Sequence, residues 1–291
     1  RSENLLAIFL GDPYLLYRAA ANEIRLSKYD YTGGTWSDVP GFTAISGGAG
    51  VITPTCLRVV KDRLVAVATL SNSAGADAIY ARRSDAGDAA VWDPAVSTLF
   101  PTQPLDTRAG ASIVWHNAVF FTTADGICVY DPDSDSFVAT FDQGDDAAIV
   151  GQKVNFGSFE FINDFLYYVL ATDSPVGAPS LYRLDGSWSV SSPSPVFTNQ
   201  SVVIPAVGGV TVSNDTGNYA LFVNGAGSLS LIYSGGLGSK LVTIAAVGAA
   251  YSISDVTSAL LPATLSGAAD LGFSIYADDR DSSSQKLTII V

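Results

Sequence analysis

The chain lacks several of the residue types on which catalytic and metal sites depend. Among its 291 residues it has no methionine, two cysteines and a single histidine, His116. These are too few for a site in which several His and Cys ligands hold a metal ion. Cys56 and Cys128 lie in separate apolar runs, which predicts buried free thiols. Position 1 is an arginine, so we expect the chain to be processed, trimmed or part of a longer one.

Charged residues are also scarce, and positive ones are outnumbered. The chain has 15 Lys and Arg against 28 Asp and Glu, which gives a net charge of −13. Such a surface repels phosphate backbones, so we expect no specific nucleic-acid binding. No apolar run approaches the roughly 20 residues of a membrane span. Helical periodicity is nearly missing, because its best segment, residues 255–265, is interrupted by Pro262.

What the chain does have is a hydrophobic fraction of 48% and many short apolar runs, which are typical of strands. Pairs of such runs recur six times at a period of about 50 residues. The pairs are 15–20 with 23–29, 63–69 with 78–84, 117–123 with 126–131, 164–172 with 180–185, 218–224 with 228–234, and 271–277 with 286–291. A β-sandwich would also use short strands, but it would not explain the period.

We therefore predict an all-β fold. It is a single β-propeller domain over residues 1–291, with six blades of three to four antiparallel strands. Five or seven blades remain open, because the first unit, residues 5–20, is weakly marked.

Four of the second runs lead into a turn and then a large aromatic residue: Asp30 to Trp36, Ser84 to Trp92, Asp131 to Phe137 and Asp185 to Trp188. The first of these turns, within residues 29–39, has the glycine and tryptophan spacing of the aspartate box of sialidase-like propellers. Tyr29 and Tyr31 stand where that box has serine and aspartate. We therefore expect a hairpin tip rather than a catalytic motif.

Signals for nucleophilic catalysis are weak. His116 has no Gly-x-Ser-x-Gly elbow to accompany it, so a structural or surface role is expected. The glycine-rich residues 235–240 lack the full spacing of a phosphate loop and are assigned to a turn.

Glycoside hydrolysis needs only two carboxylates, and the three glutamates, Glu3, Glu23 and Glu160, together with many aspartates leave such a pair open. A sialidase also needs an arginine cluster. Arg82 and Arg83 are adjacent and would point to opposite faces of a strand. We therefore expect no enzyme, no cofactor and no catalytic residue.

Asp131, Asp133 and Asp135 alternate in a short segment and have the oxygen ligands that Ca²⁺ prefers. The loop is too short for an EF-hand and lacks its final glutamate, so an aspartate-rich hairpin turn is the favoured interpretation. The same holds for residues 278–284.

A more specific pattern covers residues 58–190 and includes KDRLVAVATL, AIYARRSDAGDAAVWDP, ASIVWHNAVFFTTADGICVYD and SLYRLDGSW. Its order resembles β-propeller structural proteins of tailed-bacteriophage virions, which carry a Ser-x-x-Gly-Asp-x-x-x-Trp turn. Ser84, Gly87, Asp88 and Trp92 stand at the places of that turn.

The resemblance implies a non-enzymatic component of a phage tail, of the nozzle or fibre-anchoring type, located in the virion. Its partners would be other tail proteins and copies of itself in a ring, with DNA passing transiently and without specific binding. An extracellular propeller that binds a ligand or glycan shares the architecture and is the alternative, ahead of a sialidase-like glycoside hydrolase.

Overall fold

The computed structural model describes residues 5–46, 50–71, 77–100, 112–123, 126–142, 154–162, 165–172, 180–184, 189–191, 202–203, 219–223, 228–235, 238–247, 250–257, 266, 274–278 and 286–290. They form two compact units, Arg1–Asp142 with Ser189–Pro193 and Gln143–Trp188 with Ser194–Val291. Within these ranges no helix has the length and apolar character needed to cross a membrane.

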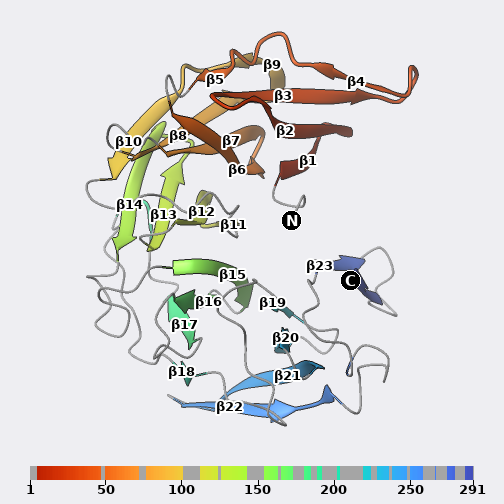
Figure 1. The fold of residues 1–291 in the computed structure, drawn as a ribbon, viewed down its shortest axis with the longest axis vertical. Coiled ribbons are helices and arrows are strands. Elements are labelled where there is room, and N and C mark those ends of the chain that lie inside the picture. Colours follow the sequence, from red (N-terminus) through yellow and green to blue (C-terminus); the bar gives the residue numbers. More distant parts are fainter. Residues whose placement is uncertain are drawn as a thin grey trace. The chain divides into compact units, whose positions relative to one another are not determined.

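The first unit contains three antiparallel sheets (Figure 1). The first sheet has the order β1-β2-β3-β4, with strands Leu6–Phe9, Asp12–Ala20, Glu23–Asp30 and Thr35–Asp38, and β5 (Ile45–Ser46) pairs with β3. The second has the order β10-β8-β7-β6; its strands are β6 Val51–Val60, β7 Arg63–Ser71, β8 Asp77–Asp85 and β10 Val96–Phe100, and β9 (Asp88–Trp92) pairs with β8. The third runs β11-β12-β13-β14 through Ser112–Trp115, Ala118–Thr123, Gly126–Asp131 and Ser136–Asp142.

The second unit continues the pattern. One sheet has the order β15-β16-β17-β18, with strands Val154–Ile162, Phe165–Thr172, Ser180–Leu184 and Val202–Val203. The next has the order β19-β20-β21-β22, with strands Tyr219–Val223, Leu229–Gly235, Gly238–Val247 and Ala250–Asp255. A two-stranded sheet pairs β23 (Ser274–Asp278) with β24 (Lys286–Ile290).

The chain is all-β, and its successive antiparallel sheets are those of a β-propeller. All six predicted hairpins are confirmed, each as a pair of hydrogen-bonded neighbouring strands. The position of the hairpin in its sheet varies: four hairpins are the two middle strands of their sheets, β19 and β20 are the first two strands of theirs, and β23 and β24 pair only with each other among the described strands. The number of six blades stays a prediction.

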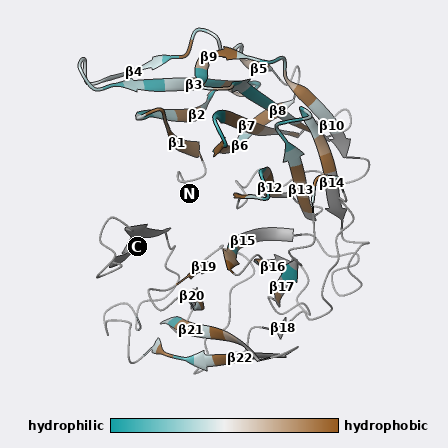
Figure 2. Ribbon diagram, turned by 180° about the vertical axis from the view of Figure 1, so that it is seen from behind, coloured by the Kyte–Doolittle hydropathy of each residue, from teal (hydrophilic) through white to brown (hydrophobic). Residues whose placement is uncertain are grey.

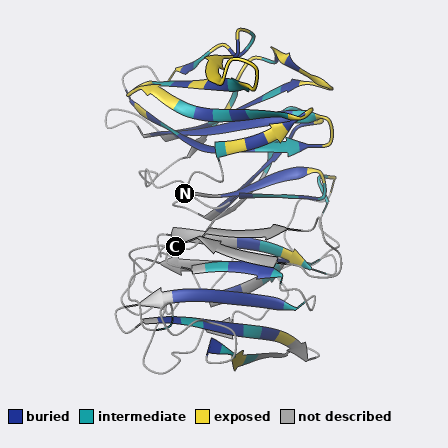
Figure 3. Cartoon of the chain, turned by 90° about the vertical axis from the view of Figure 1, so that its right-hand side faces the viewer, coloured by how far each residue is buried: buried dark blue, intermediate teal, exposed yellow. Residues whose placement is uncertain are grey.

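Strand β7 shows how the sheets of the first unit pack. Its residues Leu64, Ala66, Ala68 and Leu70 join the core with the first sheet, while Val65 and Val67 join the core with the third. Both faces are buried, so the strand is almost continuously apolar, whereas other strands alternate hydrophobic and hydrophilic residues (Figure 2). Exposed residues are most frequent in the N-terminal sheet at the top of Figure 3.

Candidate functional site

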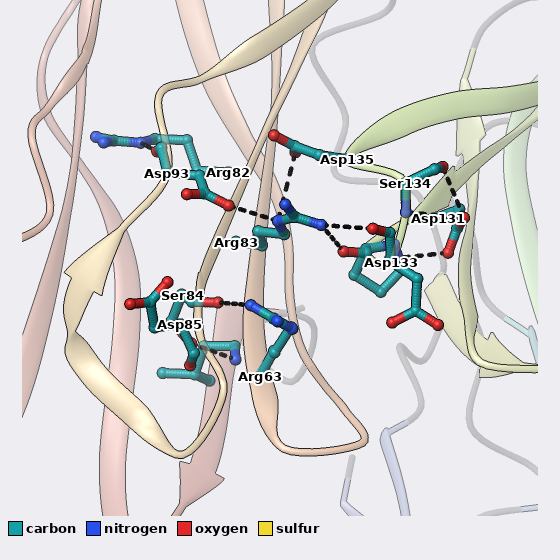
Figure 4. Close-up of polar contacts among 12 residues, drawn as sticks. Arg63, Arg82, Arg83, Ser84, Asp85, Asp93, Asp131, Asp133, Ser134 and Asp135 are labelled. Atoms are coloured by element: carbon teal, nitrogen blue, oxygen red, sulfur yellow. Dashed lines mark hydrogen bonds and ion pairs between the residues drawn. The ribbon is translucent and has the colours of Figure 1, made fainter.

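The alternating aspartates lie in the turn between β13 and β14 (Figure 4). Asp131 accepts hydrogen bonds from the backbone of its own turn, at 2.9 and 3.1 Å. Asp133 forms an ion pair with Lys61, with 2.5 Å between Nζ and Oδ2. Asp135 accepts a hydrogen bond from the Tyr130 hydroxyl at 2.5 Å. The three carboxylates thus bind different partners within and beside a hairpin, the arrangement of a turn.

The turn between β3 and β4 has the same construction. Asp30 Oδ1 accepts a hydrogen bond from the turn backbone at 2.8 Å, and Gly34 has a positive φ of 64°. Asp135 takes the corresponding position in the other turn, with φ of 52°. In both hairpins the next cross-strand pair is aromatic, Tyr29 with Trp36 and Tyr130 with Phe137. The predicted hairpin tip is confirmed, while residues 185–188 lie outside the described residues.

Arg82 and Arg83 point to opposite faces of β8, as predicted. Arg82 donates to the carbonyl oxygen of Thr43, which lies between β4 and β5 of the first sheet, and its guanidinium lies 5.1 Å from the ring of Phe42. Arg83 donates from Nε to Asp93 Oδ2 at 2.6 Å and reaches the β13–β14 turn of the third sheet (Figure 4). The two side chains therefore connect the second sheet to both of its neighbours.

The remaining candidates have local structural roles. His116 and Asn117 both have positive φ and form the two-residue turn between β11 and β12, where the His116 ring lies 4.2 Å from that of Trp115. The predicted turn within residues 235–240 is confirmed in part: Gly235 pairs with Gly238 across the two strands, and residues 238–240 belong to β21 rather than to the turn.

Both cysteines are free and buried, as predicted. Burial raises the pKa of Cys56 to about 11.

The glutamates differ in their surroundings. Glu23 is paired with Arg25, and Glu3 lies outside the described residues, as do positions 279–284. Glu160 is half-buried on β15, and its carboxylate accepts a hydrogen bond from the Phe161 backbone at 3.0 Å. Burial raises the pKa of Glu160 despite this hydrogen bond, so its environment favours the protonated form.

A pocket of ≈ 290 Å³ lies between the first sheet and the β8–β9 hairpin. Its floor includes a row across three neighbouring strands, because Tyr14 of β2 pairs with Lys28 of β3, and Lys28 pairs with Ser37 of β4. Cross-strand partners share one face of a sheet, so these three side chains lie side by side. The other lining residues are Leu10, Asp12, Asp38, Val39, Pro40, Gly87, Asp88, Ala89 and Ala90.

The wall from the second sheet is fixed by hydrogen bonds. Gly87, with φ of 66°, donates its N–H to the Asp62 carbonyl at 2.7 Å. Asp88 Oδ1 accepts the N–H of Ala90 at 2.7 Å. Gly41, which lies between β4 and β5 of the first sheet, passes so close to the β8–β9 hairpin that a Cβ added to it would overlap the Ala90 carbonyl oxygen. The wall is therefore fixed within the second sheet by hydrogen bonds, and its backbone lies in close contact with that of the first sheet at Gly41.

The charges in the pocket are mostly negative. Lys28 Nζ lies 2.5 Å from Asp12 Oδ2, and this hydrogen bond raises the pKa of Lys28. Burial raises the pKa of Tyr14, so its hydroxyl stays protonated. A hydrogen bond from Tyr17 lowers the pKa of Asp38. Asp12 and Asp88 thus set two carboxyl groups against the one ammonium group of Lys28, whereas the Asp38 carboxylate lies on the other face of the sheet, where it binds Tyr17, Arg25 and Ser27.

Sequence reasoning did not find this pocket, because its lining comes from four separated segments. Lys28 and Ser37 look like ordinary solvent-facing strand residues, and only the register brings them beside Tyr14. Gly87 and Asp88 did stand out in the sequence, but as marks of a turn.

No protein-family model and no curated protein matches the sequence. Among solved structures, the chain is similar to an α-L-arabinanase from Penicillium chrysogenum complexed with arabinobiose, with 13% identity, coverage of 94% of this chain and 68% of that one, and a TM-score of 0.47. It is also similar to an endo-arabinase from Bacteroides thetaiotaomicron, with 14% identity, coverage of 86% of this chain and 92% of that one, and a TM-score of 0.38. A third similar structure is an ulvan lyase bound to a sugar ligand. It has 11% identity, coverage of 87% of this chain and 70% of that one, and a TM-score of 0.44.

These structures correct two predictions. The expected function, a structural component of a phage tail, is wrong, because the similar structures include glycoside hydrolases and polysaccharide lyases. The expectation that the chain is not an enzyme is wrong for the same reason. The sequence pattern at residues 58–190 covers strands of three successive sheets. The alternative, a propeller that acts on or binds carbohydrate, agrees better with these structures.

Proposed function

We propose that the chain is a carbohydrate-binding β-propeller and that the pocket between the first sheet and the β8–β9 hairpin holds a sugar unit. The observation that supports this most is the row of Tyr14, Lys28 and Ser37 beside Asp12 and Asp88. Carboxylates accept hydrogen bonds from sugar hydroxyls, and an ammonium and a hydroxyl donate to sugar oxygens. A concave site with a few fixed polar groups is the usual form of a small-ligand site.

The charges favour an uncharged sugar over an acidic one. Asp12 and Asp88 would repel a uronate or a sulfate, and Lys28, the cation that could attract it, is already paired with Asp12. The net charge of −13 would also slow the approach of a polyanionic polysaccharide. The ligand class proposed is therefore a neutral oligosaccharide.

Calorimetric titration with arabinobiose, xylobiose and digalacturonate tests this function. We expect one of the neutral disaccharides to bind and digalacturonate not to bind. Lys28→Met should weaken the binding by about ten- to a hundredfold, because a charged hydrogen bond contributes about 1.5–3 kcal/mol. Arg18→Met, on the exposed end of β2, is the matched control and should bind as the wild type does. Equal affinity of wild type and Lys28→Met would refute a role for this pocket.

A second candidate function is glycoside hydrolysis, and the environment of Glu160 favours it. A carboxyl group whose pKa is raised by burial remains protonated closer to neutral pH and can give its proton to the leaving oxygen of a glycosidic bond. Release of reducing sugar from soluble arabinan or xylan is the measurement. We expect turnover in the wild type and its loss in Glu160→Gln. Turnover that survives this change would exclude Glu160 as the proton donor.

A further inference from the structure

The first sheet has a second surface, on the face opposite the pocket row. Tyr29 and Trp36 pair directly across β3 and β4, with ring centroids 5.2 Å apart and planes inclined at 55°. Tyr31, in the turn, meets Tyr29 edge to face at 5.3 Å. The Tyr31 and Trp36 side chains are 66% and 44% exposed. We call these three residues the aromatic platform.

Polar groups adjoin the aromatic platform on the same face. Ser27 pairs with Asp38 across β3 and β4, two residues along from the aromatic pair. Asp38 therefore lies on the same face as Trp36 and next to it. Asp38 accepts hydrogen bonds from Ser27 Oγ at 3.1 Å and from Tyr17 at 2.6 Å. Its second oxygen accepts one from Arg25 at 3.0 Å. Arg25 and Asp38 are each 46% exposed at the side chain, so their remaining donors and acceptors face solvent.

We propose that this face is a second carbohydrate-binding surface, separate from the pocket. One sugar ring stacks its C–H groups on Trp36 and Tyr31, because the electron-rich face of an aromatic ring attracts such positive edges. The hydroxyls of the same or the next sugar unit bind Asp38 and Arg25, which present a carboxylate and a guanidinium side by side. The platform thus offers what a sugar has, an apolar face bordered by hydroxyls.

A protein partner fits this surface less well. Stable protein interfaces bury about 800 Å² on each partner and surround a central apolar anchor with further packed contacts. Here three aromatic side chains stand at the end of one hairpin, and the row next to them is charged and polar. The aromatic platform matches the size of one or two sugar units rather than a protein surface.

The ligand class rests on the proposed function, but the residues do not, so the two proposals can fail separately. Affinity electrophoresis through gels that contain soluble arabinan, xylan or polygalacturonate measures polysaccharide binding. We expect arabinan or xylan to retard the wild type, and Trp36→Ala to weaken that binding about tenfold, the loss expected from one stacked ring. Tyr31→Ala should weaken it as well, and this turn residue can be changed without disturbing strand pairing.

Val91→Ala is the matched control, because Val91 is an exposed hydrophobic residue on β9 that belongs to neither surface. If Trp36→Ala and Tyr31→Ala were both retarded as much as the wild type, the proposed role of the aromatic platform would be refuted. The proposed role of the pocket would not be affected. No retardation of the wild type by any neutral polysaccharide would refute the platform too. Binding of disaccharide in the calorimeter would then show that the pocket stands without it.

Trp36 also gives a direct readout. Among the tryptophans that the structure describes, Trp36 is exposed, whereas Trp92 and Trp115 are 8% and 4% exposed, so a ligand that stacks on the platform should shift the tryptophan emission of the protein. Xylohexaose and arabinohexaose are the probes, and the shift should be lost in Trp36→Ala. A shift of the same size in that variant would contradict the proposal.

Discussion

Arg83 links two sheets of the first unit, and we expect the removal of its contacts to lower the stability of that unit. From β8 it binds Asp93 Oδ2 at 2.6 Å, donates to the Pro132 and Asp133 carbonyls of the third sheet, and lies 3.9 Å from Asp135 (Figure 4). Burial alone would lower the pKa of Arg83, but the hydrogen bond and charge of Asp93 raise it above the ordinary arginine value. The side chain is therefore charged and acts as a link between two sheets.

Replacing Arg83 with methionine keeps most of its apolar stem and removes the guanidinium. The Arg83 side chain is 18% exposed and that of Asp93 31%, so the pair is shielded more than a surface ion pair and less than a fully buried one. A charged hydrogen bond contributes about 1.5–3 kcal/mol, and breaking a fully buried pair costs about 3–5 kcal/mol. We expect Arg83→Met to lower the free energy of unfolding by about 2–3 kcal/mol.

Thermal unfolding followed by circular dichroism is the assay. In a chain of this size a loss of that order lowers the Tm by about 5–10 °C. Arg83→Lys should recover only part of the loss, because an ammonium cannot bind Asp93 and the turn carbonyls with one planar group. Arg18→Met is the matched control and should change stability by less than about 0.5 kcal/mol, because Arg18 is exposed.

A double-mutant cycle with Asp93→Asn separates the ion pair from the carbonyl contacts. If the two changes add, Asp93 is not the important partner, and the carbonyls of the turn are. An unfolding free energy of Arg83→Met within about 0.5 kcal/mol of the wild type would refute the reasoning, because it would show that the link between the sheets contributes nothing.

Three other predictions follow from single positions. Gly41→Ala should cost about 3 kcal/mol in denaturant unfolding, because the new Cβ meets the Ala90 carbonyl and the backbone must move. The wild type should lose stability relative to Glu160→Gln as pH rises from about 4 to 7, because the raised pKa of Glu160 makes its ionisation cost more in the folded state; Tm values across this range would check it. Cys56 and Cys128 should resist a thiol reagent in the native protein, and both should react in denaturant.

Strand pairing could be predicted from the sequence because it is locally encoded. The alternation of apolar residues in 15–20 and 23–29 fixes which face of each strand is buried, and the period shows that the unit repeats. The turn at Asp30 could be predicted for the same reason, since its aspartate and glycines act on backbone a few residues away. Each of these interactions has a short separation in sequence.

The pocket and the aromatic platform could not be predicted in the same way. Lys28 lies beside Tyr14 only in the observed register of β2 and β3. A shift of that register by one residue would place the Lys28 side chain on the other face of the sheet. Asp88 reaches the pocket only because the second sheet packs on the first, a contact that no local pattern encodes. Tyr29 and Trp36 were noted in the sequence as a turn feature, but their exposure depends on the rest of the sheet.

The motif that suggested a phage protein is explained by what each of its residues does in the fold. Ser84 Oγ accepts the N–H of Leu64 at 3.0 Å and joins β8 to β7. Gly87 supplies the positive φ of the β8–β9 turn, and Asp88 caps the turn backbone. Trp92 donates from its indole N–H within its own strand at 2.8 Å and packs in the core. A set of residues chosen by hairpin geometry will recur in any propeller that uses this hairpin, so it indicates the fold and carries no information on the ligand.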